Sequence, residues 1–258
     1  MVLTRRRAVR RTRIARLAVA AGLAAACALS SASARASGEV WVWYEHQVRL
    51  HDPSPALPRV DLRVMSNARF SGRSDGLELM LARAGPILHA APWLAVATHA
   101  TAVASRTATR AFQQEYRWEI DLVPHFRVGD IIVLDRNRFA YINRPGAPFN
   151  RYRQMLQLTY APKGAKWMPF AFHEMFFPIT KPELAETWTA LGVGRSVGGA
   201  RVDLAYMLRA RFSGSGETDH VAWLAVVLPV PEPKRARPQP ASDDDRTPEH
   251  ETHIEHGN

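Results

Sequence analysis

The chain has 258 residues, of which 34 are Lys or Arg and 24 are Asp or Glu, so its formal net charge is +10. Residues 1–36 contain eight of the arginines and no acidic residue, which leaves the rest of the chain near +2. Because the positive charge belongs mostly to this first segment, a nucleic-acid-binding function loses its main support.

The first 36 residues have the pattern of a bacterial secretory signal peptide. An Arg-rich start precedes an apolar run from Leu17 to about Leu29, and the sequence Ala-Arg-Ala at 34–36 fits a cleavage site. The apolar run is too short for a permanent transmembrane helix. The spacing before Cys27, the only cysteine, does not fit a lipoprotein signal. We therefore expect an exported mature chain without a disulfide.

Residues 38–230 consist of segments of about a dozen residues in which polar and apolar side chains alternate, separated by Pro, Gly, Asn, Asp or Ser. Alternation at period two is typical of β-strands, and no amphipathic helix is evident. The segments predict an all-β domain over 38–230. In chain order the expected strands are 39–50, 58–70, 76–88, 92–105, 110–123, 130–142, 151–161, 166–179, 187–198, 200–212 and 219–230.

The segment 111–121 shows the alternation most strictly. One face carries Phe112, Gln114, Tyr116, Trp118 and Ile120, and the other carries Gln113, Glu115, Arg117, Glu119 and Asp121. A soluble β-sandwich or lipocalin-like barrel would bury the apolar face and expose the charged one. A transmembrane barrel would place the apolar face in lipid and the charged face in its lumen.

Strand length and aromatic residues favour the transmembrane barrel. Strands of soluble sandwiches average about five or six residues, whereas a tilted membrane strand needs about nine to eleven. Aromatic residues gather near the expected strand ends, as in the interfacial girdles of outer-membrane barrels. We predict an antiparallel up-and-down transmembrane β-barrel of 10–12 strands, with an even number favoured. The girdle candidates are Trp41, Trp43, Tyr44, Phe70, Trp93, Phe126, Tyr141, Phe149, Tyr152, Tyr160, Trp167, Phe176, Phe177, Trp188 and Phe212.

Several short motifs resemble a proteobacterial family known as domain of unknown function 2490 (DUF2490). They are Trp41-Val-Trp43, QQEYRWE at 113–119, RNRF at 136–139, RYR at 151–153 and FHEMFF at 172–177. The resemblance covers about residues 38–230 and implies an exported outer-membrane β-barrel. It implies no activity and no catalytic residue. One departure is that the last expected strand ends in Leu-Pro-Val at 228–230, where outer-membrane barrels usually end on an aromatic residue.

Charged residues on the polar faces form the expected lumen lining. Two interpretations stay open for this set: a narrow pore whose arginines favour anions, or a salt-bridged plug that closes the barrel. The expected lining residues are Glu45, Arg49, Arg59, Arg63, Arg69, Glu115, Arg117, Glu119, Asp121, Arg153, Glu174, Arg201, Asp203, Arg209 and Arg211.

Catalytic, metal and cofactor sites are not indicated. His173 and Glu174 are neighbours on one expected strand and so point to opposite faces, which predicts that Glu174 pairs with a lumen arginine rather than acting in catalysis. Residues 231–258 are rich in Pro, charge and His, which predicts a disordered periplasmic tail whose histidines are solvated rather than metal-bound.

The sequence predicts an outer-membrane barrel that is not an enzyme and acts as a small channel or a structural element. The alternatives are an outer-membrane lipid hydrolase and a soluble periplasmic lipocalin-like binding protein. The expected partners are outer-membrane lipid and the outer-membrane assembly machinery, with no nucleic acid, cofactor or protein partner indicated.

Overall fold

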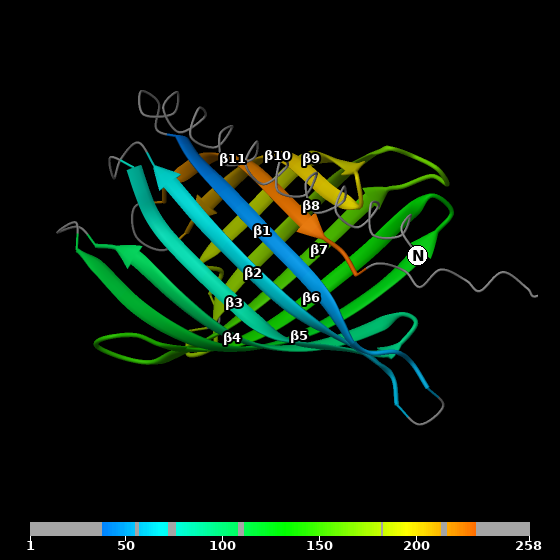
Figure 1. The fold of residues 1–258 in the computed structure, drawn as a ribbon. Coiled ribbons are helices and arrows are strands. Elements are labelled where there is room, and N and C mark those ends of the chain that lie inside the picture. The colour runs from blue at the N-terminus through cyan, green and yellow to red at the C-terminus, as the bar shows by residue number, and fades with distance from the viewer. Residues whose placement is uncertain are drawn as a thin grey trace, which may run out of the picture.

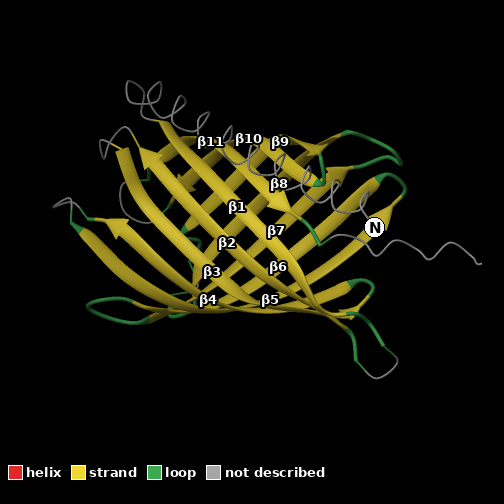
Figure 2. Cartoon of the chain, viewed as in Figure 1, coloured by secondary structure: helices red, strands yellow, loops and turns green. Residues whose placement is uncertain are grey.

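The computed structural model describes residues 38–54, 57–71, 76–107, 111–181, 183–212 and 216–230. The predicted signal peptide and tail lie outside these residues. Eleven strands make up the secondary structure of the described residues (Figures 1 and 2): β1 Gly38–His51, β2 Arg59–Ser71, β3 Gly76–Ala91, β4 Leu94–Arg106, β5 Phe112–Val128, β6 Ile131–Asn143, β7 Phe149–Tyr160, β8 Trp167–Pro178, β9 Glu186–Val197, β10 Ala200–Arg211 and β11 Thr218–Leu228. The described residues include no helix long and apolar enough to cross a membrane.

The strands form a closed barrel in which each strand pairs antiparallel with its neighbours along the chain, except at the seam between β1 and β11. There the two strands run parallel, with Gly38 opposite His220 and His46 opposite Leu228. The all-β class and the barrel are confirmed, but the even strand number favoured from the sequence is wrong. An odd number of alternating strands brings the first and last strands together in the same direction, so the ring can close only through a parallel pair.

All eleven expected strands are present, with shifted ends. The largest difference is in β5, which was expected to end at residue 123 and continues to Val128. The expected end comes just before Pro124, a residue type that often bounds strands because it has no N–H to donate. In the structure β4 has reached its turn at that point, and the backbone N–H of His125 donates to the carbonyl of Trp93 at 2.8 Å.

Alternation along each strand divides the side chains into an inner and an outer set. On β5, Tyr116 and Trp118 are 54% and 67% exposed, whereas Glu119 and Asp121, at alternate positions further along the strand, are buried. Exposed Phe139 and Tyr141 repeat the outer pattern on β6. The outer surface of the barrel is therefore mainly apolar, and most of the charged strand residues point into the lumen.

Four of the predicted girdle aromatics point inward instead. Trp41, Phe176 and Trp188 are buried in one apolar cluster with Met207, and Trp43 packs against that cluster. Each lies near a strand end but at an inward position of the alternation, so position along the strand alone did not fix its face. The expectation that these four rings join the girdles is wrong.

The barrel has two rims, here called the Gly38 rim, where β1 begins, and the His51 rim, where β1 ends. Three connections at the His51 rim have only two residues, at 92–93, 129–130 and 198–199. In the last of these, Gly198 and Gly199 have φ of 59° and 93°, a conformation that favours glycine and suits a tight hairpin turn. β11 ends at this same rim.

Candidate functional site: the filled lumen

The centre of the lumen contains a group of ion-paired side chains, here called the central network. Its members come from β3, β5, β6, β7 and β8 and are Arg83, Glu119, Asp121, Arg136, Arg138, Arg153 and Glu174. Most are fully buried. Charges so far from water are tolerated only when they are paired and hydrogen-bonded.

Arg138 and Asp121 form the best-defined pair of the central network. The guanidinium donates two parallel hydrogen bonds, Nε to Oδ1 and Nη2 to Oδ2, each 2.6 Å long. This bidentate geometry is the strongest arrangement for an arginine and a carboxylate. The strands β5 and β6 place the two residues directly opposite each other, so the pair also links neighbouring strands.

Glu119 extends the central network across β4. Its carboxylate lies 2.7 Å from Arg83 on β3 and 3.6 Å from Arg138 on β6. The hydroxyl of Thr101 on β4 donates to it at 2.7 Å, and Arg83 in turn donates to that hydroxyl. Inward side chains of the four consecutive strands β3, β4, β5 and β6 are thus connected to one another by hydrogen bonds and ion pairs.

Glu174 joins the other half of the central network. Arg153 on β7 and Arg136 on β6 approach its carboxylate at 2.9 and 2.7 Å. His173, the neighbour of Glu174 on β8, is exposed and hydrogen-bonds to Thr189 at 2.8 Å. The structure therefore places His173 and Glu174 on opposite faces of the barrel wall.

An aromatic cluster from β1, β8 and β9 meets the central network. Trp41, Trp188 and Phe176 contact one another with ring centroids 4.6–4.7 Å apart. The guanidinium of Arg153 lies 4.3 Å from the ring centroid of Phe176, and that of Arg69 lies 3.6 Å from the centroid of Trp41. Cation–π contacts of this kind are favourable where water is excluded. The guanidiniums of Arg69 on β2 and Arg153 on β7 also lie 5.3 and 5.1 Å from the ring centroid of Trp188 on β9. Side chains of strands that are not adjacent therefore touch inside the barrel.

The lumen contains a small cavity. A cavity of about 230 Å³ lies among residues of ten strands, with Trp43, Phe172, Arg136, Met155 and Trp223 on its walls. A cavity of this size holds a small cluster of water molecules.

Two further groups of ion pairs lie toward the rims. At the Gly38 rim, Arg209 lies 2.6 Å from Glu186 and 3.3 Å from Glu39, and Arg211 pairs with Asp219. At the His51 rim, Asp61 is fully buried and accepts hydrogen bonds from Arg59, with Arg49 3.8 Å away and His89 2.9 Å away.

The fifteen predicted lining residues do not form one site. Four of them, Glu119, Asp121, Arg153 and Glu174, belong to the central network, and Arg209 and Arg211 belong to the Gly38-rim group. Arg49 and Arg59 belong to the His51-rim group. The others form separate neighbouring contacts: Arg63 with Glu45 at 3.2 Å, Arg117 with Glu115, Arg201 with Asp203 at 2.6 Å, and Arg69 with Trp41.

Several inward charged residues were not predicted from the sequence, among them Glu39, Arg83, Arg136, Arg138, Glu186 and Asp219. On β6 the outward positions include Asp135 and Asn137 while the inward ones are Arg136 and Arg138, so both faces are polar and neither stands out. On β3, Arg83 lies between two alanines, so the inward and outward faces differ little in polarity at that point. The period-two pattern was a usable signal only where the outer face was clearly apolar.

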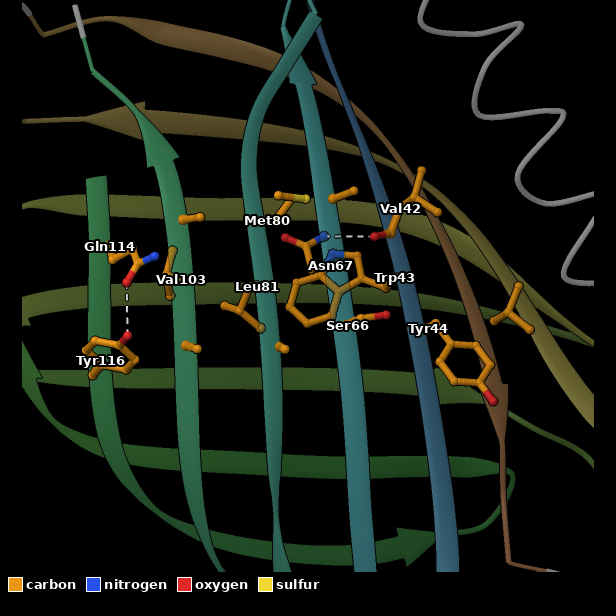
Figure 3. Close-up of a pocket in the computed structure, with 15 residues that line it drawn as sticks. Val42, Trp43, Tyr44, Ser66, Asn67, Met80, Leu81, Val103, Gln114 and Tyr116 are labelled. Atoms are coloured by element: carbon orange, nitrogen blue, oxygen red, sulfur yellow. Dashed lines mark hydrogen bonds between the residues drawn. The ribbon is translucent and has the colours of Figure 1, made fainter. Parts of the chain in front are cut away.

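The outer wall carries a groove of about 740 Å³ across β1–β5 (Figure 3). Small side chains such as Ala82 and Ala102 line it beside Tyr44, Met80 and Tyr116. Its lining includes no acid, base or imidazole, so it offers an apolar surface and no acid–base chemistry.

Comparison with known proteins places the described barrel in a family. A family model with the description "Protein of unknown function (DUF2490)" matches residues 38–220. No curated protein matches this chain.

Two solved structures are similar in fold at low identity. LpxR from Salmonella typhimurium has 9% identity and a TM-score of 0.39, with 67% of this chain and 83% of that chain covered. A loop-deletion mutant of OmpT, an outer membrane protein of Vibrio cholerae, has 15% identity and a TM-score of 0.36, with 62% and 59% covered. At these TM-scores neither likeness carries an argument about function.

Proposed function

We propose, starting from the fact that this chain belongs to the DUF2490 family, that it is an integral outer-membrane β-barrel with a closed lumen that acts as a structural membrane protein rather than as an open pore. The observation that carries the proposal is the contact of Trp188 on β9 with Trp41 on β1, Arg69 on β2 and Arg153 on β7, which joins strands that are not adjacent across the interior of the barrel.

The outer surface supports the membrane placement. Phe112, Tyr141 and Phe212 are exposed near the Gly38 rim, and Trp93 and Trp167 are exposed near the His51 rim. Exposed aliphatic residues lie between these two groups. Large contiguous apolar surfaces are unfavourable in water, whereas an apolar band between two aromatic girdles is typical of outer-membrane barrels.

Strand length supports the same placement. The strands have 11 to 17 residues, and about nine to eleven are enough for a tilted strand to cross a bilayer. The two-residue turns at the His51 rim favour the periplasm for that rim, because outer-membrane barrels have short periplasmic turns and longer extracellular loops. This orientation places the end of β11 and the expected tail in the periplasm.

The buried ion pairs support a closed rather than a conducting lumen. An anion-selective pore needs cationic groups that face water, but Arg138 is buried and both of its hydrogen-bonding edges are directed at Asp121 and Glu119. Arg153 is held between Glu174 and the ring of Phe176. These two arginines are thus held by protein partners.

Membrane fractionation and conductance together test the proposal. We expect the full chain to stay with washed outer membranes, to migrate differently on gels with and without boiling, and to give no stepwise conductance in a planar bilayer. A variant with Arg153→Ala and Arg138→Ala lacks two large side chains of the central network and is expected to leak ions.

Two results would contradict the proposal in different ways. Regular conductance steps from the unmodified protein would show an open pore and refute the closed lumen. Recovery of the protein only in the soluble periplasmic fraction, with no gel shift, would refute the membrane placement and favour a lipocalin-like binding protein.

A further inference from the structure

A cluster of polar side chains interrupts the apolar outer surface of β6 and β7. It consists of Asp135, Asn137, Tyr152 and Gln154, here called the outer polar cluster. Asn137 donates to Asp135 at 3.1 Å, Tyr152 donates to Asn137 at 2.5 Å, and Gln154 lies 3.5 Å from Asp135. The four side chains therefore form one hydrogen-bonded group.

Strand alternation fixes the outward direction of this group. Arg136 and Arg153 point into the lumen, where both bind Glu174. Their sequence neighbours on each strand must point to the other side of the wall. Asn137 is paired with Gln154 across the two strands, so the cluster faces outward on β6 and β7 together.

The cluster lies near the middle of its strands and not at a rim. Asn137 is central in β6, Ile131–Asn143, and Gln154 is near the centre of β7, Phe149–Tyr160. Phe139, Leu156 and Leu158 around it are each close to half exposed. In the proposed membrane placement, on which this inference rests, the cluster thus lies at the depth of the hydrocarbon, where lipid offers no hydrogen-bonding partner.

We propose that the outer polar cluster is the contact surface between two copies of this chain within the membrane. A symmetric interface uses the same patch on both subunits and must be complementary to itself. The cluster meets this requirement because it contains a carboxyl acceptor in Asp135 and amide groups in Asn137 and Gln154 that both donate and accept. Polar side chains of this kind hold membrane-spanning elements together where the surrounding solvent is lipid.

A lipid is a poorer occupant for this surface. Acyl chains cannot donate or accept hydrogen bonds, and the polar headgroups lie at the level of the rims. The surrounding apolar side chains, such as Val133 and Leu156, can pack against their counterparts and exclude lipid from the polar centre. A different protein with a complementary polar patch is an outcome that the experiment below distinguishes.

Cysteine crosslinking in intact outer membranes tests the interface. Cys27 is the only cysteine, so a Cys27→Ser background carries no other thiol. Leu156→Cys adds a thiol beside the cluster and leaves the cluster itself intact. Val64→Cys is the matched control, because it is a similarly exposed apolar residue near the middle of β2 on a distant part of the wall. Mild oxidation should give a band of twice the monomer mass several-fold more strongly for Leu156→Cys.

Removal of the polar groups provides the second measurement. In the Leu156→Cys background, Asn137→Leu combined with Gln154→Leu should reduce the crosslinked fraction to the level of Val64→Cys. Gln114→Leu replaces an exposed polar residue on β5 and should leave crosslinking unchanged. The gel shift on boiling shows for each variant whether the barrel has formed.

Each other outcome overturns the proposal. Equal crosslinking at both positions, or crosslinking that survives loss of the polar groups, would show that the cluster is not the interface. A heat-modifiable protein in the membrane without a dimer band would refute the second copy while the membrane placement stands. A crosslinked band of a different mass would identify another protein as the occupant.

Discussion

Replacement of Arg138 by methionine should destabilise the barrel more than loss of the exposed rim charge Asp52. Methionine keeps much of the volume of the side chain but removes both hydrogen bonds to Asp121, while Glu119 keeps its contact with Arg83. The main loss of stability therefore comes from the Asp121 carboxylate, which stays fully buried without its arginine partner. Removal of one partner from a buried pair costs about 3–5 kcal/mol.

The assay is urea unfolding of the protein reconstituted in lipid vesicles, followed by tryptophan fluorescence. With a slope of about 1–3 kcal/mol per molar urea, a loss of about 3 kcal/mol lowers the unfolding midpoint by about 1 M or more. The control is Asp52→Asn, which breaks the exposed pair with Arg49 and should change stability by less than about 1 kcal/mol.

A double variant separates the effect of the unpaired Asp121 carboxylate from the effect of the altered packing at position 138. In Arg138→Met with Asp121→Leu, no unpaired Asp121 remains, so the double variant should be more stable than Arg138→Met alone. If Arg138→Met and Asp52→Asn cost the same, or if the double variant is the least stable, the reasoning from the buried bidentate pair is refuted.

Two further substitutions test the packing of the wall and the lumen. Gly85→Ala should prevent formation of the heat-modifiable barrel, because a Cβ there would lie 1.8 Å from the backbone oxygen of Thr98. The control Gly38→Ala, where the nearest neighbour of the new Cβ is 3.6 Å away, should fold normally, and equal gel shifts for the two variants would contradict this prediction. Trp41→Ala should cost about 3–5 kcal/mol in the same unfolding assay, whereas Trp118→Ala on the outer wall should cost less than about 1 kcal/mol, and the reverse order would contradict the assigned faces.

The sequence predicted the fold well because an up-and-down barrel repeats one local rule. Each strand on its own shows the period-two alternation, and the positions of Tyr116, Trp118 and Glu119 already separated the apolar face from the charged face. The closure of the ring is different, because it depends on the pairing of Gly38 with His220, which no local pattern encodes. An even strand number was therefore a reasonable expectation that the parallel seam overturned.

The interior was less predictable because partner choice depends on register between strands. Arg83 and Glu119 come from strands that are not adjacent, and the hydroxyl of Thr101 on β4 between them is hydrogen-bonded to both. The position of Trp41 was likewise ambiguous, since an aromatic residue at a strand end suits either a girdle or a core. Its inward position follows from its parity with Glu39, whose carboxylate accepts a hydrogen bond from the Trp41 indole.

The parallel seam also determines where the chain enters and leaves the barrel. Because β1 and β11 run in the same direction, the chain enters at one rim and leaves at the other. Across a membrane, sequences attached before Gly38 and after Leu228 would face different compartments. An epitope at each end would report opposite sides of the membrane in intact cells, and a circular permutant would need a linker as long as the barrel is tall.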